Sequence, residues 1–209
     1  FNKSKGELSV SSGHKIKEII YKINRHGWSL YSIPGGGEVS LGGCIGNDVH
    51  GKDSFKCGNF SQNIIEMEVI LPNKKKIKCS PKRNQHIFKS VCGGLGLIGI
   101  ITHVKLRLKP ISKSYESTTV ACSNYKDLIY NLYKDKDKYE YINGWVDIFA
   151  KNKNIGRSII FKSKKILDNN RKNNLNTSKF FNIIQENLFG YCVRNNLVKY
   201  INFFIYYYF

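Results

Sequence analysis

The sequence predicts an α+β fold in two parts. Three observations predict it: short segments in which apolar and polar residues alternate, isoleucines that recur at helical spacing over residues 16–23, and a change of character after Pro110. Alternation places every second side chain on one face of a strand, whereas spacings of three and four residues share one face of a helix. We expect residues 1–111 to form a small mixed sheet with helices, and residues 112–209 to form a second domain built on an antiparallel sheet.

The first part is expected to alternate strands with short helices. Glycine at residue 27 ends the isoleucine-rich helix, and Pro72-Asn73-Lys74 supplies the turn of a hairpin. Ser40 is a candidate N-cap, and exposed amides at the start of its helix would point at whatever lies before Gly42 and Gly43. The expected elements are, in order, a strand at 7–11, a helix through 16–23, an extended segment at 28–33, helical turns within 44–50, strands at 64–71 and 75–79, a helix at 85–91 and a strand at 100–108.

The second part reads as a further sheet with one helix. We expect strands at 117–122, 141–149 and 157–161 and a helix at 125–133. Residues 162–179 are rich in Asn and Lys and are predicted to be a long surface excursion. The aromatic run 200–209 reads as a strand or helix that stops in mid-run, with an interfacial aromatic anchor as the alternative.

The charge is the unusual feature of the composition. Thirty-four Lys and Arg residues against 15 Asp and Glu residues give a formal net charge of +19. Nucleic acid, acidic lipid and phosphorylated ligands are the partners that such a charge favours. The lysines are spread over the whole length, however, so a general compositional bias accounts for the charge as well. Four prolines, 18 glycines and 41% hydrophobic residues exclude collagen-like and low-complexity classes.

The cysteines do not form a metal-binding pattern. All six lack a Cys-x-x-Cys partner and a histidine at zinc-ligand spacing: Cys44, Cys57, Cys79, Cys92, Cys122 and Cys192. We therefore expect no metal site, and we expect free thiols in a reducing cytosol. No stretch approaches the roughly 20 apolar residues that cross a bilayer.

Two glycine clusters carry the clearest functional signal. GGGEVSLGG covers residues 35–43 and GGLGLIG covers residues 93–99, and neither fits a dinucleotide fingerprint or a Walker loop. Glycines allow a backbone to approach a pyrophosphate closely, so a large anionic cofactor is one interpretation and tight turns alone are the other. His50-Gly51-Lys52 follows the first cluster and would place titratable groups beside such a cofactor.

Three longer strings resemble a known family: PGGGEVSLGGCIGNDVHGKD, FKCGNFSQNIIEMEVILPNKK and FKSVCGGLGLIGIITHVKLRLKP. Together they resemble the second subdomain of the PCMH-type FAD-binding domain, also called the vanillyl-alcohol-oxidase type. The decaprenylphosphoryl-β-D-ribose 2′-oxidase branch is the most similar, because sugar-lactone and alditol oxidases usually have Ser in place of Lys52. Weaker similarity to the substrate domain of that branch continues to residue 165, through Trp145, Asp147, Gly156 and Arg157.

The resemblance implies FAD as the cofactor and assigns contacts to it. Along the pyrophosphate and ribityl chain would lie Gly35, Ser40, Leu41, Gly42 and Gly43. The flavin would be followed by Asn47, Asp48, Val49 and His50, and Ile101 would contact the cofactor through its backbone. His50 and Lys52 are the catalytic candidates, on the substrate side of the flavin; the alternative for Lys52 is a solvated surface lysine.

The resemblance also implies an activity. The intact protein would be an FAD-dependent oxidoreductase that oxidises a polyprenyl-phosphate-linked pentose to its 2-keto form for cell-envelope polysaccharide. A separate keto-sugar reductase would be its partner, and it would be cytoplasmic or peripheral at the inner face of the membrane. One alternative is an aldonolactone or alditol oxidase with a soluble sugar.

The alternative of another class is an inactive flavin fold or a basic binding module. Four lysines of the predicted hairpin favour a basic module: Lys74, Lys75, Lys76 and Lys78. Aromatic residues do not interleave with them as a stacking platform requires, so we expect no nucleic-acid partner. The resemblance implies a first FAD subdomain before residue 1 and a return segment after residue 209. We therefore expect this fragment alone to hold part of the cofactor site and to be inactive.

Overall fold

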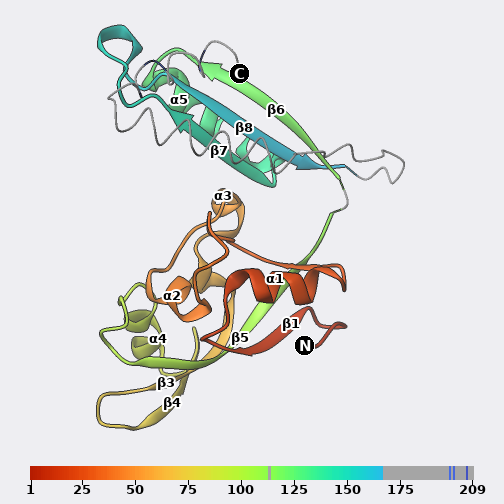
Figure 1. The fold of residues 1–209 in the computed structure, drawn as a ribbon, viewed down its shortest axis with the longest axis vertical. Helices are drawn as coiled ribbons and strands as arrows, with labels where there is room; N and C mark the ends of the chain where they lie inside the picture. The colour runs from red at the N-terminus through yellow and green to blue at the C-terminus, as the bar shows by residue number, and fades with distance from the viewer. Residues whose placement is uncertain (113, 167–197, 199, 201–205, 207–209) are drawn as a thin grey trace. The chain divides into compact units, whose positions relative to one another are not determined.

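The computed structural model describes residues 1–112, 114–166, 198, 200 and 206 of the chain (Figure 1). The chain divides into two compact units, Phe1–Ser112 and Lys113–Phe209. Both units combine helices with antiparallel strands, so the predicted α+β class is confirmed.

The sheet of the first unit is organised around β5 (Ile100–Pro110), its longest strand. β1 (Glu7–Ser11) and β3 (Ile64–Ile70) pair with opposite edges of β5, β4 (Lys76–Cys79) pairs with β3, and β2 (Trp28–Leu30) pairs with the end of β5. All of these pairings are antiparallel, so the expectation of a mixed sheet is wrong. The reason is that β5 pairs with β3, which runs in the opposite direction. β4 runs in the same direction as β5, so a parallel pairing would have required β5 to lie beside β4.

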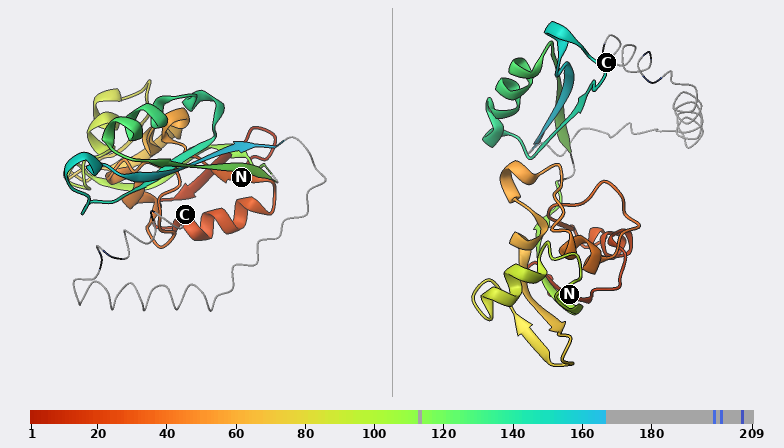
Figure 2. Two further views of the ribbon diagram at one scale, coloured as in Figure 1. Left: turned by 90° about the horizontal axis from the view of Figure 1, so that it is seen from above. Right: turned by 90° about the vertical axis from the view of Figure 1, so that its left-hand side faces the viewer.

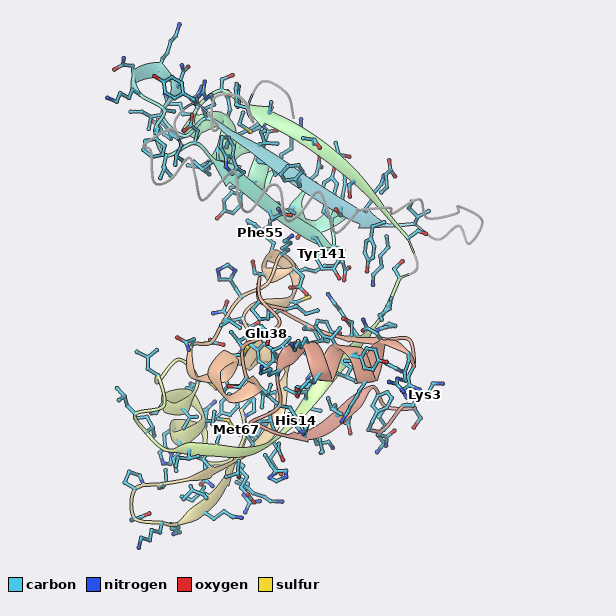
Figure 3. The ribbon with its side chains drawn as sticks, viewed as in Figure 1. Lys3, His14, Glu38, Phe55, Met67 and Tyr141 are labelled. Carbon is cyan, nitrogen blue, oxygen red and sulfur yellow. The ribbon has the colours of Figure 1, made fainter. Side chains whose placement is uncertain are left out.

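Four α-helices and one short 3-10 helix, η1 (Phe60–Asn63), complete the first unit. The α-helices are α1 (Ile16–Asn24), α2 (Leu41–Gly46), α3 (Ser54–Cys57) and α4 (Gln85–Val91). α1 lies alongside β1 (Figures 1 and 2) and buries Ile16, Ile19 and Ile23, none of which is more than 3% exposed. Figure 3 places His14 just before this helix and Met67 on β3, where the methionine is buried in the same core. The predicted helical isoleucine repeat is therefore confirmed.

Charged side chains cover the solvent-facing side of this sheet. Lys76 Nζ lies 3.2 Å from a carboxylate oxygen of Glu68, and Lys78 Nζ lies 3.6 Å from one of Glu66. The pKa of Glu68 is held below its usual value, mainly by a hydrogen bond from Thr102 and to a smaller extent by the hydrogen bond and charge of Lys76. Two of the four hairpin lysines are therefore paired with carboxylates, which weakens the case for a basic binding module.

In its described part, the second unit combines a three-stranded antiparallel sheet with an α-helix that packs on it. Its strands are β6 (Tyr115–Cys122), β7 (Tyr141–Val146) and β8 (Ser158–Lys165), in the order β6-β8-β7, and its helix is α5 (Tyr125–Tyr133). Cys122, Ile142 and Ile160 form the core beneath α5. The helix has the predicted bounds, whereas β7 ends three residues earlier than predicted.

β8 extends further than its sequence predicts. Lys162 is only 4% exposed and its Nζ donates a hydrogen bond to the Lys134 carbonyl oxygen at 3.0 Å. The predicted surface excursion is thus wrong over 162–165, because cross-strand pairing with both neighbours overrides the polar composition. Its remainder beyond residue 166, and the aromatic run apart from Tyr200 and Tyr206, lie outside the described residues. In the part that the structure describes, no helix has the length and apolarity needed to cross a membrane.

Candidate functional site

A groove of about 380 Å³ opens in the first unit where the two glycine-rich segments meet. Its walls come from the turn after β1, from both ends of α2 and from the loop that precedes β5. The polar side chains in the wall are Ser12, Ser40 and Asn47, and apolar residues such as Ile98 and Ile101 complete it. Of the residues that the structure describes, none that lines the groove is charged. The site is therefore neutral although the chain carries a large positive charge.

The second glycine cluster caps the C-terminal end of α2. Gly93 N donates to the Ile45 carbonyl oxygen at 3.0 Å, and Leu95 N donates to that of Gly46 at 2.8 Å. Carbonyl groups at the end of a helix have no partner within the helix, so these two bonds satisfy them. A Cβ on Gly46 would lie 3.6 Å from Gly96 N, which shows how closely the two segments pack.

The first turn of α2 is satisfied from within the protein. Ser40 is its N-cap and accepts a hydrogen bond from Gly43 N at 3.1 Å, as the residue type predicts. Leu41 N donates to the His14 carbonyl oxygen at 2.9 Å, and Gly42 N donates to that of Ser12 at 2.8 Å. The expectation that the amides of Gly42 and Gly43 point at a ligand is therefore wrong. What faces the groove instead is the Ser40 hydroxyl, which accepts from Gly43 and keeps its own hydrogen for another acceptor.

The structure brings together half of the predicted cofactor contacts. The following line the groove: Ser40, Gly42, Gly43, Asn47 and Ile101. The others do not: Gly35 lies in an exposed loop, the Leu41 side chain is buried in the core, and Asp48, Val49 and His50 lie beyond the end of α2. Their roles at the cofactor stay predictions.

Asp48 turns the chain from α2 toward His50. Its backbone has a φ of +41°, in the left-handed region that residues other than glycine rarely adopt. Its carboxylate accepts hydrogen bonds from Ser61 N at 2.9 Å and from Asn59 Nδ2 at 3.3 Å, which hold this turn. Hydrogen bonds from Asn59 and Ser61 thus hold Asp48 in the turn that follows α2.

The His50-Gly51-Lys52 loop presents two exposed side chains on a fixed backbone. His50 and Lys52 are exposed, whereas Gly51 between them is buried. A Cβ on Gly51 would lie 2.7 Å from Ser32 Cα and 2.6 Å from an oxygen of Asp53, so only glycine fits there without movement. The loop is therefore pressed against the segment that leads into the first glycine cluster.

A buried ion pair lies directly behind this loop. Lys109 Nζ is 2.7 Å from Asp53 Oδ2, and the two side chains are 5% and 2% exposed. Ser32 N donates to both oxygens of the same carboxylate, at 3.2 Å each. Neither of these charged residues was predicted from the sequence as part of the site. Alternation along β5 places Lys109 on the polar side with Lys105, and nothing local distinguishes the two lysines.

Four of the described cysteines are free thiols that pack in or against the two apolar cores: Cys44, Cys79, Cys92 and Cys122. Burial raises the pKa of Cys44 to about 11, and burial followed by the charge of Asp48 raises that of Cys92 to about 12. Both thiols are therefore protonated near neutral pH and are poor nucleophiles. No cluster of metal-ligating side chains occurs within the described parts of the chain, and Cys192 lies outside them.

Comparison with known proteins shows which family of domains the first unit resembles. Residues 1–80 match the family model described as FAD binding domain. Decaprenylphosphoryl-β-D-ribose oxidase of Mycolicibacterium smegmatis is 26% identical over 156 residues, which are 73% of this chain and 34% of the oxidase. The chain carries a PCMH-type FAD-binding domain. Its cofactor is FAD, so the cofactor predicted from the resemblance is confirmed.

Two further relatives share this domain with other activities. Cytokinin dehydrogenase 1 of Arabidopsis thaliana is 30% identical over 145 residues, which are 68% of this chain and 25% of the dehydrogenase. D-arabinono-1,4-lactone oxidase of Debaryomyces hansenii is 32% identical over 104 residues, which are 50% of this chain and 18% of the oxidase. The chain thus aligns with 18% to 34% of the length of these three relatives.

The groove of the FAD-binding domain fits part of FAD. Gly42 lets the chain lie close to the turn after β1, since a Cβ there would approach Ser12 Cβ to 3.3 Å. The Ser40 hydroxyl and the Asn47 side chain are neutral groups that would hydrogen-bond to phosphate or ribityl oxygens. Ile98 and Ile101 provide apolar surface of the kind on which a flat ring packs.

Proposed function

We propose that the whole protein is an FAD-dependent oxidoreductase that oxidises a CH–OH group of a sugar. The observation that carries this proposal is the placement of exposed His50 and Lys52 on a backbone-fixed loop, shortly after the segment that lines the glycine-rich groove. When bound, FAD supplies the two-electron acceptor for such a reaction. The Lys52 ammonium would hold an anionic group of the substrate or balance negative charge that develops in the reaction. His50 would hydrogen-bond to the substrate hydroxyl.

We propose a polyprenyl-phosphate-linked pentose as the substrate, oxidised to its 2-keto form. The similarity to decaprenylphosphoryl-β-D-ribose oxidase and the cation at Lys52 support this choice. Oxidation of a carbinol removes a hydride and a proton, and a separate reductase that adds hydride to the other face of the ketone would complete an epimerisation. The net product would serve cell-envelope polysaccharide synthesis.

An aldonolactone or alditol oxidase is the second candidate. It is supported by the similarity to D-arabinono-1,4-lactone oxidase, which reaches 32% over its aligned residues. The two candidates share the cofactor and differ in the charge of the substrate. They are therefore distinguished by what Lys52 contributes.

The test of the cofactor assignment is the colour of the purified whole protein. We expect a yellow protein with a flavin absorbance band, whose flavin is released on denaturation and identified as FAD by chromatography. A folded, colourless protein that does not take up added FAD would contradict the proposal and favour the basic binding module. A yellow protein without turnover on either sugar class would indicate the inactive flavin fold.

A lipid-linked substrate would bring the protein to the inner face of the membrane, and α5 offers a surface for that contact. Its outer side exposes Tyr125, Ile129, Tyr130 and Tyr133, each between 51% and 61% exposed. Lys134 Nζ lies 5.4 Å from the Tyr130 ring centroid, and Lys136 Nζ lies 5.5 Å from that of Tyr133. Aromatic rings accompanied by lysines suit the interface of an anionic bilayer. We therefore propose peripheral binding through α5.

Replacing both Tyr130 and Tyr133 by Ser should weaken vesicle binding. Each ring would lose its burial among the lipid headgroups, and we expect about a tenfold fall in affinity for vesicles that contain phosphatidylglycerol. Cosedimentation measures this directly. Tyr21→Ser is the control. Tyr21 is likewise exposed, at 73%, and its ring centroid lies 4.9 Å from Cζ of the cationic Arg25, but it belongs to α1 and not to α5. Equal binding by the double variant and the wild type would remove α5 from the proposal.

A further inference from the structure

We propose that the buried Asp53–Lys109 ion pair positions the His50-Gly51-Lys52 loop. The inference rests on the proposed function, because it concerns where His50 and Lys52 are held relative to the flavin. Asp53 and Lys109 are positioning residues, and neither needs to touch substrate or cofactor.

The ion pair joins three segments that are distant in the sequence. Lys109 lies near the end of β5, Asp53 follows the loop directly, and Ser32 belongs to the segment that leads into the first glycine cluster. Ser32 has a φ of +50° and its hydroxyl donates to the Gly58 carbonyl oxygen at 2.8 Å. A serine persists in this left-handed conformation only when its surroundings hold it there.

Gly51 couples the ion pair to the exposed side chains. A Cβ on Gly51 would meet both the Ser32 backbone and the Asp53 carboxylate, so Gly51 packs against both with no room for a side chain. Movement of the Asp53 carboxylate therefore displaces Gly51, and His50 and Lys52 move with it. The coupling runs through contacts of the backbone, which has less freedom to adapt than an exposed side chain.

The chemical nature of the Asp53–Lys109 contact indicates that it positions the loop and does not only fill space. A buried ion pair is often no more stabilising than well-packed apolar residues, because both charges lose their hydration. It does impose direction: the carboxylate must face Lys109 Nζ and Ser32 N at once. The Tyr31 ring, 5.5 Å from Lys109 Nζ, gives the cation a further partner. An arrangement of this kind selects one loop conformation over others.

The experiment compares Lys109→Met with Lys105→Met in the whole, FAD-loaded protein. Lys105 lies on the same strand and also pairs with a carboxylate, that of Glu7 at 2.8 Å, but this pair is only half-buried, with side chains 40% and 24% exposed. The reduction potential of the flavin is measured for both variants, for Lys52→Met and for the combination of Lys52→Met with Lys109→Met. If the ion pair only stabilised the fold, nothing would follow for how the shifts in flavin potential caused by Lys52→Met and Lys109→Met combine in the double variant.

We expect Lys109→Met to shift the potential in the same direction as Lys52→Met, and to add nothing once Lys52 is already replaced. Lys105→Met should leave the potential unchanged. Without FAD, amide exchange over residues 49–57 should become about 100-fold faster in Lys109→Met only. If Lys109→Met fails to fold, the Asp53→Asn/Lys109→Met variant removes both charges while the amide oxygen still accepts from Ser32 N, and the same shift is expected.

Three results would overturn the inference. If Lys52→Met shifts the potential and Lys109→Met does not, the ion pair has no positioning role and the proposed function stands. If the effects of Lys52→Met and Lys109→Met add, the ion pair acts independently of the loop. If Lys52→Met itself leaves the potential unchanged, Lys52 does not lie beside the flavin, and that part of the proposed function fails together with the inference.

Discussion

Replacing Lys52 by Met should lower kcat/KM for a prenyl-phosphate pentose by about 10-fold to 150-fold. The substitution removes a hydrogen bond from a charged donor, which contributes roughly 1.5 to 3 kcal/mol, and 1.36 kcal/mol corresponds to a factor of ten in rate. The loss should be smaller for a free lactone or alditol, which brings no phosphate charge to the site. Flavin content should not change, because Lys52 does not line the groove. Steady-state kinetics on both substrate classes at fixed salt measure the effect.

Lys89→Met is the control for this comparison. Lys89 is an exposed lysine on α4, so the substitution changes the net charge equally without touching the loop. Equal losses on both substrate classes, or good wild-type turnover only on the free sugar, would favour the aldonolactone or alditol oxidase. No loss on either class would make Lys52 an ordinary surface lysine.

Replacing Gly43 by Val should weaken FAD binding by about 5-fold to 150-fold, since overfilling a packed contact typically costs about 1 to 3 kcal/mol and roughly 1.4 kcal/mol is a factor of ten in affinity. A Cβ at Gly43 would meet only Ser40 Oγ, at 3.2 Å, and the rest of the side chain would extend into the groove. The thermal midpoint of the FAD-free protein should stay close to that of wild type, because the side chain meets no buried backbone. Flavin titration and thermal unfolding are measured on the same samples.

Gly36→Val is the control for Gly43→Val. A Cβ on Gly36 has open space around it, and Gly36 does not line the groove. FAD affinity should therefore be unchanged in this variant. If Gly43→Val binds FAD as tightly as Gly36→Val does, the groove is not where the cofactor lies.

The regular elements of the fold follow from local patterns in the sequence. The isoleucine spacing of α1 and the alternation around Val104 and Leu106 in β5 each involve neighbours within a few residues. The N-cap role of Ser40 likewise depends on its own residue type and on an amide three positions later. Such features are readable in one sequence because both partners lie in the same short window.

The features that could not be predicted depend on partners far away in the chain. The amide of Gly42 is satisfied by Ser12, thirty positions earlier, and Lys109 is buried because Asp53 meets it from fifty-six positions away. Period-two alternation assigns Lys109 to solvent, and only the tertiary contact overrides that assignment. The loop that carries the catalytic candidates was readable from its residues, whereas the pair that lies behind it was not.

None of the described residues that line the groove is charged. The rate at which FAD binds and the time for which it stays bound should therefore depend differently on ionic strength. A net charge of +19 produces a field that draws a diphosphate toward the protein from solution, and this attraction acts over about 8 Å at physiological ionic strength. Within the groove, the cofactor would be held by hydroxyl, amide and apolar contacts, which added salt screens little. Ionic strength would therefore govern the association rate of FAD far more than its residence time. A newly made chain would load its cofactor most rapidly in dilute salt and retain it almost equally well in concentrated salt.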